Sequence, residues 1–283
     1  MRRSGELRAV FRGVYVSAAV EDSLELRAEA AALVLGPNQI VCDRAAAFLH
    51  GVDAYGVREA HARRLETCVL RGGVRARRHG VDGRERDLAR FDVQSRRGLA
   101  VTTPLRTALD LGCALPRHRA LGVMDELARR HGLDRAAIEE GSRRFRGRRG
   151  VIQLRDLAAL VDPLAESQRE SWLRLDIADA GLPAPTLQWW VLDQGVPLWR
   201  LDLAYPAQKV AVEYDGELFH RETTDQIESD ARRRAWLRAN GWSVIVVRKE
   251  DFAGGARLLW LEALREALAP QTRRFRWEPA RHN

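Results

Sequence analysis

PLWRLDLAYPAQKVAVEYDGELFH, residues 197–220, is predicted to form two strands joined by a tight turn, and these strands decide the fold of the C-terminal part of the chain. In the first strand the large hydrophobic residues at odd-numbered positions 199–205 alternate with a less apolar series at even-numbered positions 198–204. This period of two places Asp202 on the less apolar face. In the second strand Glu213 and Asp215 share one face. The short turn predicts an antiparallel register that sets Asp202 beside residues 211–213. Three carboxylates therefore occupy one patch.

Carboxylates held this close would raise one another's pKa values unless a cation neutralised them. Mg²⁺ suits such a site because it prefers oxygen ligands and is usually held by one or two protein carboxylates. We therefore predict that Asp202 and Glu213 bind Mg²⁺, with Mn²⁺ as an alternative. His220 follows a bend at Gly216, so its imidazole could return to the patch as a proton-transfer group. The alternative is a hairpin whose polar face is simply solvated, but the combination of these residues with Asp215 favours a site.

The order Asp202, then Glu213-x-Asp215-Gly, then His220 resembles the PD-(D/E)XK nuclease superfamily, in particular the branch related to the very-short-patch-repair (Vsr) endonucleases. The resemblance spans roughly the last 120 residues, a length that suits one small domain. It includes SQRESWLRLDIADAGLPAPTLQ upstream of the hairpin and TDQIESDARRRAWLRANGWSVIVVRKEDF downstream. By this resemblance Asp202 and Glu213 hold Mg²⁺, Glu170 supports the site and His220 assists the chemistry. Asp215 stands where the superfamily usually has Lys, so Asp215 and His220 both remain candidates for the proton acceptor.

Glu170 lies on a predicted helix at residues 165–180, on the same stripe as the core positions Leu173 and Ile177. An unpaired buried carboxylate is costly, so a metal site or its support would explain this position. The alternative is that Glu170 lies at the rim of the stripe and pairs with one of two neighbouring arginines, Arg169 or Arg174.

Three stretches nearer the N-terminus share another resemblance. They are LRAVFRGVYV at 7–16, ELRAEAAALVLGPNQIVCDRAAAFLHGVD at 25–53 and VTTPLRTALDLG at 101–112. Together they look like the AbiEi-type antitoxins, which are DNA-binding autoregulators. Members of that group usually carry a helix-turn-helix before a wing. Because little sequence precedes the predicted wing here, we expect the recognition helix to be shortened or absent.

The chain carries a formal net charge of +8, which favours a polyanionic partner such as DNA through phosphate contacts. Short strands between residues 66 and 101 predict a sheet with one basic edge, which is either a phosphate-binding strip or a solvated edge protected by charge. A second basic element is the predicted helix at 224–240. The arginines expected to contact DNA are Arg75, Arg77 and Arg78 at the strand edge, and Arg221, Arg232, Arg233 and Arg234 after the hairpin.

Composition places the chain in the cytoplasm. No stretch reaches the roughly 18 consecutive apolar residues of a membrane span, and the first residues lack the apolar region of a signal peptide, so no membrane association is expected. Cys42, Cys68 and Cys113 lack the paired spacing of a zinc site and suit reduced thiols of a bacterial cytosol.

We therefore predict an α/β chain, α+β overall. Residues 1–60 form a winged-helix-like segment with helices, residues 61–150 a small α/β antitoxin-like domain, and residues 151–283 a restriction-endonuclease-like mixed sheet flanked by helices. SRRFRGRRG at 142–150 is the expected boundary, a solvated linker or helix end, and the alternative is that its arginines contact the DNA backbone.

The predicted function is Mg²⁺-dependent hydrolysis of DNA phosphodiesters. One alternative is a DNA-binding transcriptional regulator or antitoxin of a type IV toxin–antitoxin system, with an inactive nuclease-like domain. Another is a domain that binds nucleic acid only to bring a partner there. The expected partners are DNA and either a toxin or a repair or defence protein.

Overall fold

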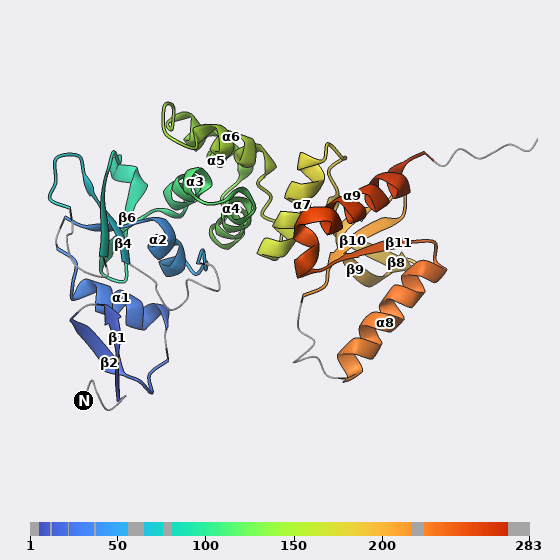
Figure 1. Ribbon diagram of the computed structural model, residues 1–283, viewed down its shortest axis with the longest axis horizontal. Helices are drawn as coiled ribbons and strands as arrows, with labels where there is room; N and C mark the ends of the chain where they lie inside the picture. Colours follow the sequence, from blue (N-terminus) through green and yellow to red (C-terminus); the bar gives the residue numbers. More distant parts are fainter. Residues whose placement is uncertain are drawn as a thin grey trace, which may run out of the picture. The chain divides into compact units, whose positions relative to one another are not determined.

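The computed structural model describes residues 6–11, 13–21, 23–36, 38–55, 65–75, 81–216 and 224–270. The chain divides into two compact units, which we call the N-terminal unit (Met1–Leu175) and the C-terminal unit (Asp176–Asn283) (Figure 1). Both contain helices and sheets of mixed strand direction, which confirms the predicted α/β class. The predicted boundaries at residues 60 and 150 both fall inside the N-terminal unit.

The N-terminal unit starts with a two-stranded antiparallel hairpin followed by a helix. The hairpin consists of β1 (Leu7–Phe11) and β2 (Val14–Ser17), and the helix is α1 (Leu24–Ala32). The chain reverses at Gly13, whose φ of +86° is favourable for glycine. The Ser23 hydroxyl begins α1 by accepting a hydrogen bond from the Leu26 amide at 3.2 Å.

A five-stranded sheet with the order β5-β4-β3-β7-β6 follows. Its strands are β3 (Ile40–Val41), β4 (Leu65–Leu70), β5 (Val81–Arg86), β6 (Val93–Arg96) and β7 (Leu99–Thr102). Strand β3 is antiparallel to β4 and parallel to β7, so the sheet is mixed. Helix α2 (Asp43–Leu49) leaves β3 directly, and the 3-10 turn η2 (Arg90–Asp92) precedes β6.

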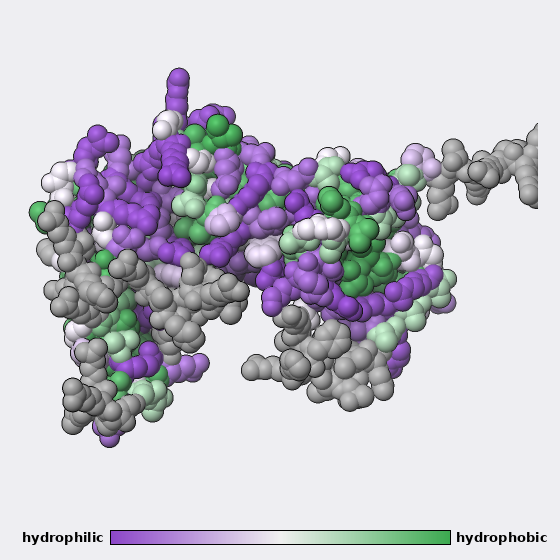
Figure 2. All heavy atoms as spheres, in the orientation of Figure 1, coloured by the Kyte–Doolittle hydropathy of each residue, from purple (hydrophilic) through white to green (hydrophobic). Residues whose placement is uncertain are grey.

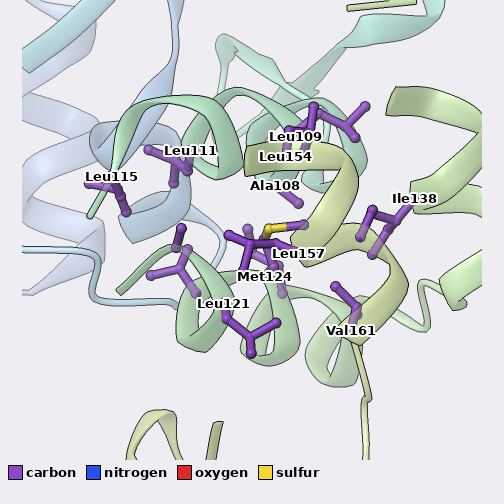
Figure 3. Packing of buried hydrophobic residues seen from close by; sticks show 14 of the residues in the cluster. Ala108, Leu109, Leu111, Leu115, Leu121, Met124, Ile138, Leu154, Leu157 and Val161 are labelled. Carbon is purple, nitrogen blue, oxygen red and sulfur yellow. The ribbon is translucent and has the colours of Figure 1, made fainter. Parts of the chain in front are cut away.

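Helices then pack around one hydrophobic core, shown in Figure 3. These helices are α3 (Pro104–Ala114), α4 (Arg117–His131), α5 (Arg135–Arg143), α6 (Val151–Leu160) and α7 (Gln168–Asp179), and the division between the units falls within α7. Thr103 caps α3 with Pro104 at its first position. In the centre of the core, Leu121, Met124 and Leu157 are fully buried.

The arginine-rich stretch at 142–150 forms the turn between α5 and α6. Phe145 anchors the turn, because its ring is only 2% exposed and belongs to the core. The guanidinium groups of Arg106 and Arg148 lie 5.1 and 4.4 Å from the centroid of this ring. The stretch expected to be a linker therefore lies inside the N-terminal unit, held by one aromatic residue.

The C-terminal unit contains a four-stranded sheet with the order β11-β10-β9-β8. Its strands are β8 (Thr186–Asp193), β9 (Val196–Tyr205), β10 (Val210–Tyr214) and β11 (Ser243–Val247). The first three run antiparallel, and β11 is parallel to β10. This parallel pairing requires a crossover, which contains α8 (Thr224–Ala239).

The last helix, α9 (Gly254–Leu268), follows the 3-10 turn η3 (Lys249–Phe252). In Figure 1, α8 and α9 lie on opposite sides of β10 and β11. From α7 to α9 the elements follow the order helix, three strands, helix, strand and helix. Among the described residues, no helix combines the length and the apolar character needed to cross a bilayer.

Candidate functional site

The predicted hairpin is present, and its antiparallel register is confirmed. Val210 lies opposite Tyr205, and Val212 lies opposite Leu203. Continuing this register by one residue on each strand sets Glu213 opposite the half-buried Asp202. Residues opposite one another on antiparallel strands project to the same face of the sheet. The backbone therefore supports the prediction that these two acids share a face.

Glu213 is 3% exposed and lies against α8. Its Oε2 accepts a hydrogen bond from Arg233 Nη2 at 2.9 Å, and Arg234 Nε lies 3.8 Å from the same oxygen. Burial raises the pKa of Glu213, while the two guanidinium groups act in the opposite direction. Arginines therefore supply the positive charge that crowded carboxylates need, in place of the predicted metal ion.

Asp215 belongs to the same ionic cluster. Its Oδ2 accepts a hydrogen bond from Arg234 Nη2 at 3.4 Å and lies 3.9 Å from Arg248 Nε. Arg233 and Arg234 are only 22% and 23% exposed because they face the sheet, whereas Arg232 is exposed. Of the three consecutive arginines predicted to contact DNA, two therefore use their charge within the fold.

The cluster retains one feature that fits a metal ion. Glu213 Oε1 is buried and has no hydrogen-bond partner, so this oxygen could act as a ligand. Within the described ranges, however, no group of three or more acidic, histidine or cysteine side chains is arranged to hold a metal. Binding of Mg²⁺ by Asp202 and Glu213 stays a prediction.

Four predicted site residues, His220, Arg221, Arg77 and Arg78, lie outside the described residues. Their roles stay predictions. Arg75, at the predicted basic edge, pairs with Glu85 at 3.1 Å, and its side chain is 57% exposed.

Glu170 is 6% exposed on α7, in the N-terminal unit. Its Oε2 accepts a hydrogen bond from the backbone amide of Glu166 at 3.0 Å. Arg174, one of its two predicted partners, pairs with Asp125 at 2.6 Å. Support of the nuclease site by Glu170 stays a prediction, because Glu213 belongs to the other unit.

Sequence reasoning missed a buried network of acids and arginines in the N-terminal unit. Its acids are Asp43, Asp92 and Asp110, each at most 5% exposed. Their partners are Arg86, Arg106, Arg144 and Arg148. The network ties the sheet to the helices, because these residues come from β5, the turn η2, helices α2 and α3, and the turn between α5 and α6.

Arg106 lies at the centre of this network. It is 1% exposed and bridges two acids, with its Nη1 3.0 Å from Asp92 and its Nε 2.8 Å from Asp110. Arg86 bridges Asp110 to Asp43, whose oxygens lie 2.6 Å from its Nη2. Only the pair Arg106 and Asp110, four residues apart on α3, could have been recognised in the sequence. The other partners come together through the tertiary fold.

Comparison with known proteins supports the antitoxin-like part of the prediction. Residues 39–160 match the AbiEi antitoxin C-terminal domain. The chain is also 34% identical, over 250 residues, to the uncharacterized proteins MT2308 and Rv2248 of Mycobacterium tuberculosis, a match that covers 88% of this chain and 88% of each relative. It belongs to the family of these mycobacterial proteins. No solved structure shows a significant match.

In this chain, the antitoxin match covers the whole five-stranded sheet and helices α2 to α6. The buried network around Arg106 lies entirely within the matched residues. The resemblance to AbiEi antitoxins is therefore confirmed for this segment. The resemblance of the C-terminal unit to Vsr endonucleases stays a prediction.

Proposed function

We propose that this family member is a DNA-binding regulator of the antitoxin type. The observation that carries the proposal is the match of residues 39–160 to the AbiEi antitoxin C-terminal domain. The net charge of +8 supports a polyanionic partner, because phosphate contacts by arginine release the counterions of DNA. The same resemblance suggests a second partner, a nucleotidyltransferase toxin that the chain would neutralise.

A basic surface suited to DNA lies on the turn between α5 and α6. Arg143, Arg146 and Arg149 are exposed there, and Figure 2 shows hydrophilic side chains projecting from this turn. The buried ring of Phe145 holds the backbone of the turn in place, so little backbone entropy is lost when its arginines bind. Guanidinium groups also match phosphate geometry in a bidentate manner. We therefore assign phosphate contacts to this turn.

The test is the salt dependence of duplex binding by the full chain, measured by fluorescence anisotropy. The double variant Arg146→Gln/Arg149→Gln should bind duplex DNA more weakly and reduce the slope of log K against log salt by about 0.9 per lost contact. Arg129→Gln, an exposed arginine on α4, is the matched control and should leave the slope unchanged. Absence of binding at low salt, or an unchanged slope in the double variant, would overturn the assignment.

The toxin partner has its own test. Expression of a nucleotidyltransferase toxin of the AbiE class should arrest growth, and co-expression of this chain should restore it. Continued arrest, with the chain present in soluble form, would count against an antitoxin role. It would leave DNA binding to be judged by the salt experiment.

A Mg²⁺-dependent endonuclease is the second candidate function. Two observations favour it: the order of elements from α7 to β11, which the nuclease resemblance implies, and the buried, unpaired Oε1 of Glu213. Asp202 and Glu213 would hold the ion, and Asp215 or His220 would accept a proton from the attacking water. A bound Mg²⁺ would supply an activated water and stabilise charge on the phosphate.

Nicking of supercoiled plasmid, with Mg²⁺ or with EDTA, tests this candidate. Asp202→Ala should abolish cleavage, and Asp193→Ala, at an exposed position on β8, should leave it unchanged. Equal cleavage by wild type and Asp202→Ala would indicate a contaminant or a wrongly assigned site. Absence of metal-dependent cleavage would overturn the nuclease candidate and leave the regulator proposal intact.

A further inference from the structure

A groove on the C-terminal unit is lined by tryptophans. Four of the eight tryptophans in the chain contribute to it, together with Lys209: Trp189 and Trp190 from β8, Trp236 from α8 and Trp242 just before β11. The cavity measures about 610 Å³ and is open to solvent. We call it the tryptophan groove. Its residues come from three stretches of the chain, 188–192, 206–209 and 236–242.

The walls and the floor of the groove differ in exposure. Trp242 is 8% exposed and packs in the core of the unit, so it forms part of the floor. Trp189 and Trp190 are 38% and 50% exposed. They lie on β8, which is the edge strand of the sheet in the described part of the unit. Large aromatic surfaces left in water are unfavourable, and an exposed cluster of them indicates a binding surface.

Two non-glycine residues with left-handed backbone line the groove. Five non-glycine residues among those described have a positive φ, and two of them, Gln188 (φ +52°) and Lys209 (φ +53°), line the groove. Left-handed backbone costs a non-glycine residue about 1 to 2 kcal/mol. Strain of this kind accumulates at functional sites, where side-chain position matters more than stability.

The charge around the groove is positive. Lys209 is one of only two lysines in the chain, and its Nζ donates a hydrogen bond to the carbonyl oxygen of Asn240 at 3.1 Å. The guanidinium of Arg200 lies 6.0 Å from the centroid of the Trp190 ring. None of the described residues that line the groove is acidic. Aromatic faces beside cations, without acids, suit a planar π-system attached to an anionic backbone.

We propose that the tryptophan groove binds unpaired nucleotides of a single-stranded nucleic acid. Bases stack on Trp189 and Trp190, and Lys209 and Arg200 attract the phosphates. Every base has a π-face, so this mode of binding tolerates different sequences. The residues that line the groove include neither the arginines assigned to duplex binding nor the carboxylates of the nuclease candidate.

The experiment measures binding of short oligothymidylate and oligoadenylate to the full chain, by tryptophan quenching and by anisotropy of labelled strands. A hairpin duplex of matched composition serves as the competing ligand. Wild type should bind the single strands, with quenching. Trp190→Leu should weaken this binding by about 5- to 150-fold, whereas Trp190→Phe should retain most of it because the aromatic face is kept. Lys209→Gln should reduce the salt slope by about 0.7.

Val196→Ala is the matched control, because Val196 is 65% exposed on the same hairpin but does not line the groove. Circular dichroism checks that each variant is folded. Equal affinity of wild type and Trp190→Leu for single strands would overturn the proposal, as would preference for the duplex. Sedimentation distinguishes a further outcome. If wild type is a dimer and Trp190→Leu is a monomer, the groove is a contact between copies and the proposal is wrong.

Discussion

His50 allows the stability of the N-terminal unit to be predicted as a function of pH. The residue ends α2, is 2% exposed and lies edge-on to the ring of His131, at 5.3 Å between centroids. Its Nε2 donates a hydrogen bond to the carbonyl oxygen of Thr102 at 2.7 Å, and its Nδ1 is buried without a partner. Burial lowers the pKa of His50 from 6.5 to about 4. The folded protein therefore keeps this imidazole neutral.

The sign of the effect follows from linkage. Below pH 6.5 the unfolded chain protonates this histidine, while the folded chain does so only near pH 4, so stability is lost as the pH falls through this window. A difference of 2.5 units corresponds to about 3 kcal/mol of unfolding free energy at 1.36 kcal/mol per unit. Replacement of His50 by Gln removes the titration and keeps an amide N–H for Thr102. Between pH 7 and pH 4, we expect the free energy of unfolding to fall by about 3 kcal/mol less in His50→Gln than in wild type.

Asp125 has the opposite effect in nearly the same window. Burial raises the pKa of its carboxyl to about 6, against the influence of Arg174, so this group reduces stability as the pH rises from about 4 to 6. Wild type and His50→Gln both contain Asp125, so its contribution to the pH dependence cancels when the two are compared. Urea unfolding at several pH values, read by pulsed hydrogen exchange of α3 and α4, isolates the unit. Equal loss of stability in wild type and His50→Gln would refute a neutral, buried His50.

Three further predictions concern packing and charge. Glu213→Gln should lower the free energy of unfolding by about 2 kcal/mol, which is less than the loss of a fully buried pair because Arg233 is 22% exposed. In urea unfolding, the double variant Glu213→Gln/Arg233→Gln should be more stable than Glu213→Gln alone. Gly150→Ala should cost about 3 kcal/mol or more, because its φ is +80° and a Cβ would collide with the carbonyl oxygen of Cys113; Gly132→Ala, at φ +64° with open space, should cost about 1 to 2 kcal/mol by the same measurement. In Ellman's assay at pH 8, native protein should react slowly and first at Cys113, whose pKa burial raises to about 11, and fast reaction of the buried Cys42 or Cys68 would contradict the core described above.

The parts of the fold that depend on local pattern could be predicted from the sequence. The alternation of residues 198–205 and the short turn predicted the antiparallel register that pairs Val210 with Tyr205 and Val212 with Leu203. Continuing this register by one residue sets Asp202 opposite Glu213. Thr103 and Pro104 likewise indicate the start of α3, because a capping residue acts within one helical turn. Such signals depend on neighbours in the sequence, and the structure confirms them.

Features that depend on distant partners could not be predicted. The stretch at 142–150 has the composition of a solvated linker, yet the buried ring of Phe145, close to the guanidinium groups of Arg106 and Arg148, anchors it to the core. The sequence likewise gave no sign that Arg86 joins Asp43 to Asp110, since 67 residues separate those two acids. Charge composition cannot distinguish an arginine that binds a phosphate from one that neutralises a buried carboxylate.

The same ambiguity applies to the carboxylate cluster of the C-terminal unit, which is either a metal site of a nuclease or an ion pair that stabilises the fold of a regulator. Crowded carboxylates require a cation, and the argument from charge is satisfied equally by Mg²⁺ or by arginine. Arg233, at 2.9 Å from Glu213, already meets that requirement. A metal ion would have to share Glu213 with this guanidinium, using Oε1, or displace it. If the chain is a regulator, Arg233 stabilises the fold, and Arg233→Gln should lower the free energy of unfolding without changing Mg²⁺ affinity. If the chain is a nuclease, Arg233 competes with the metal, and Arg233→Gln should raise Mg²⁺ affinity.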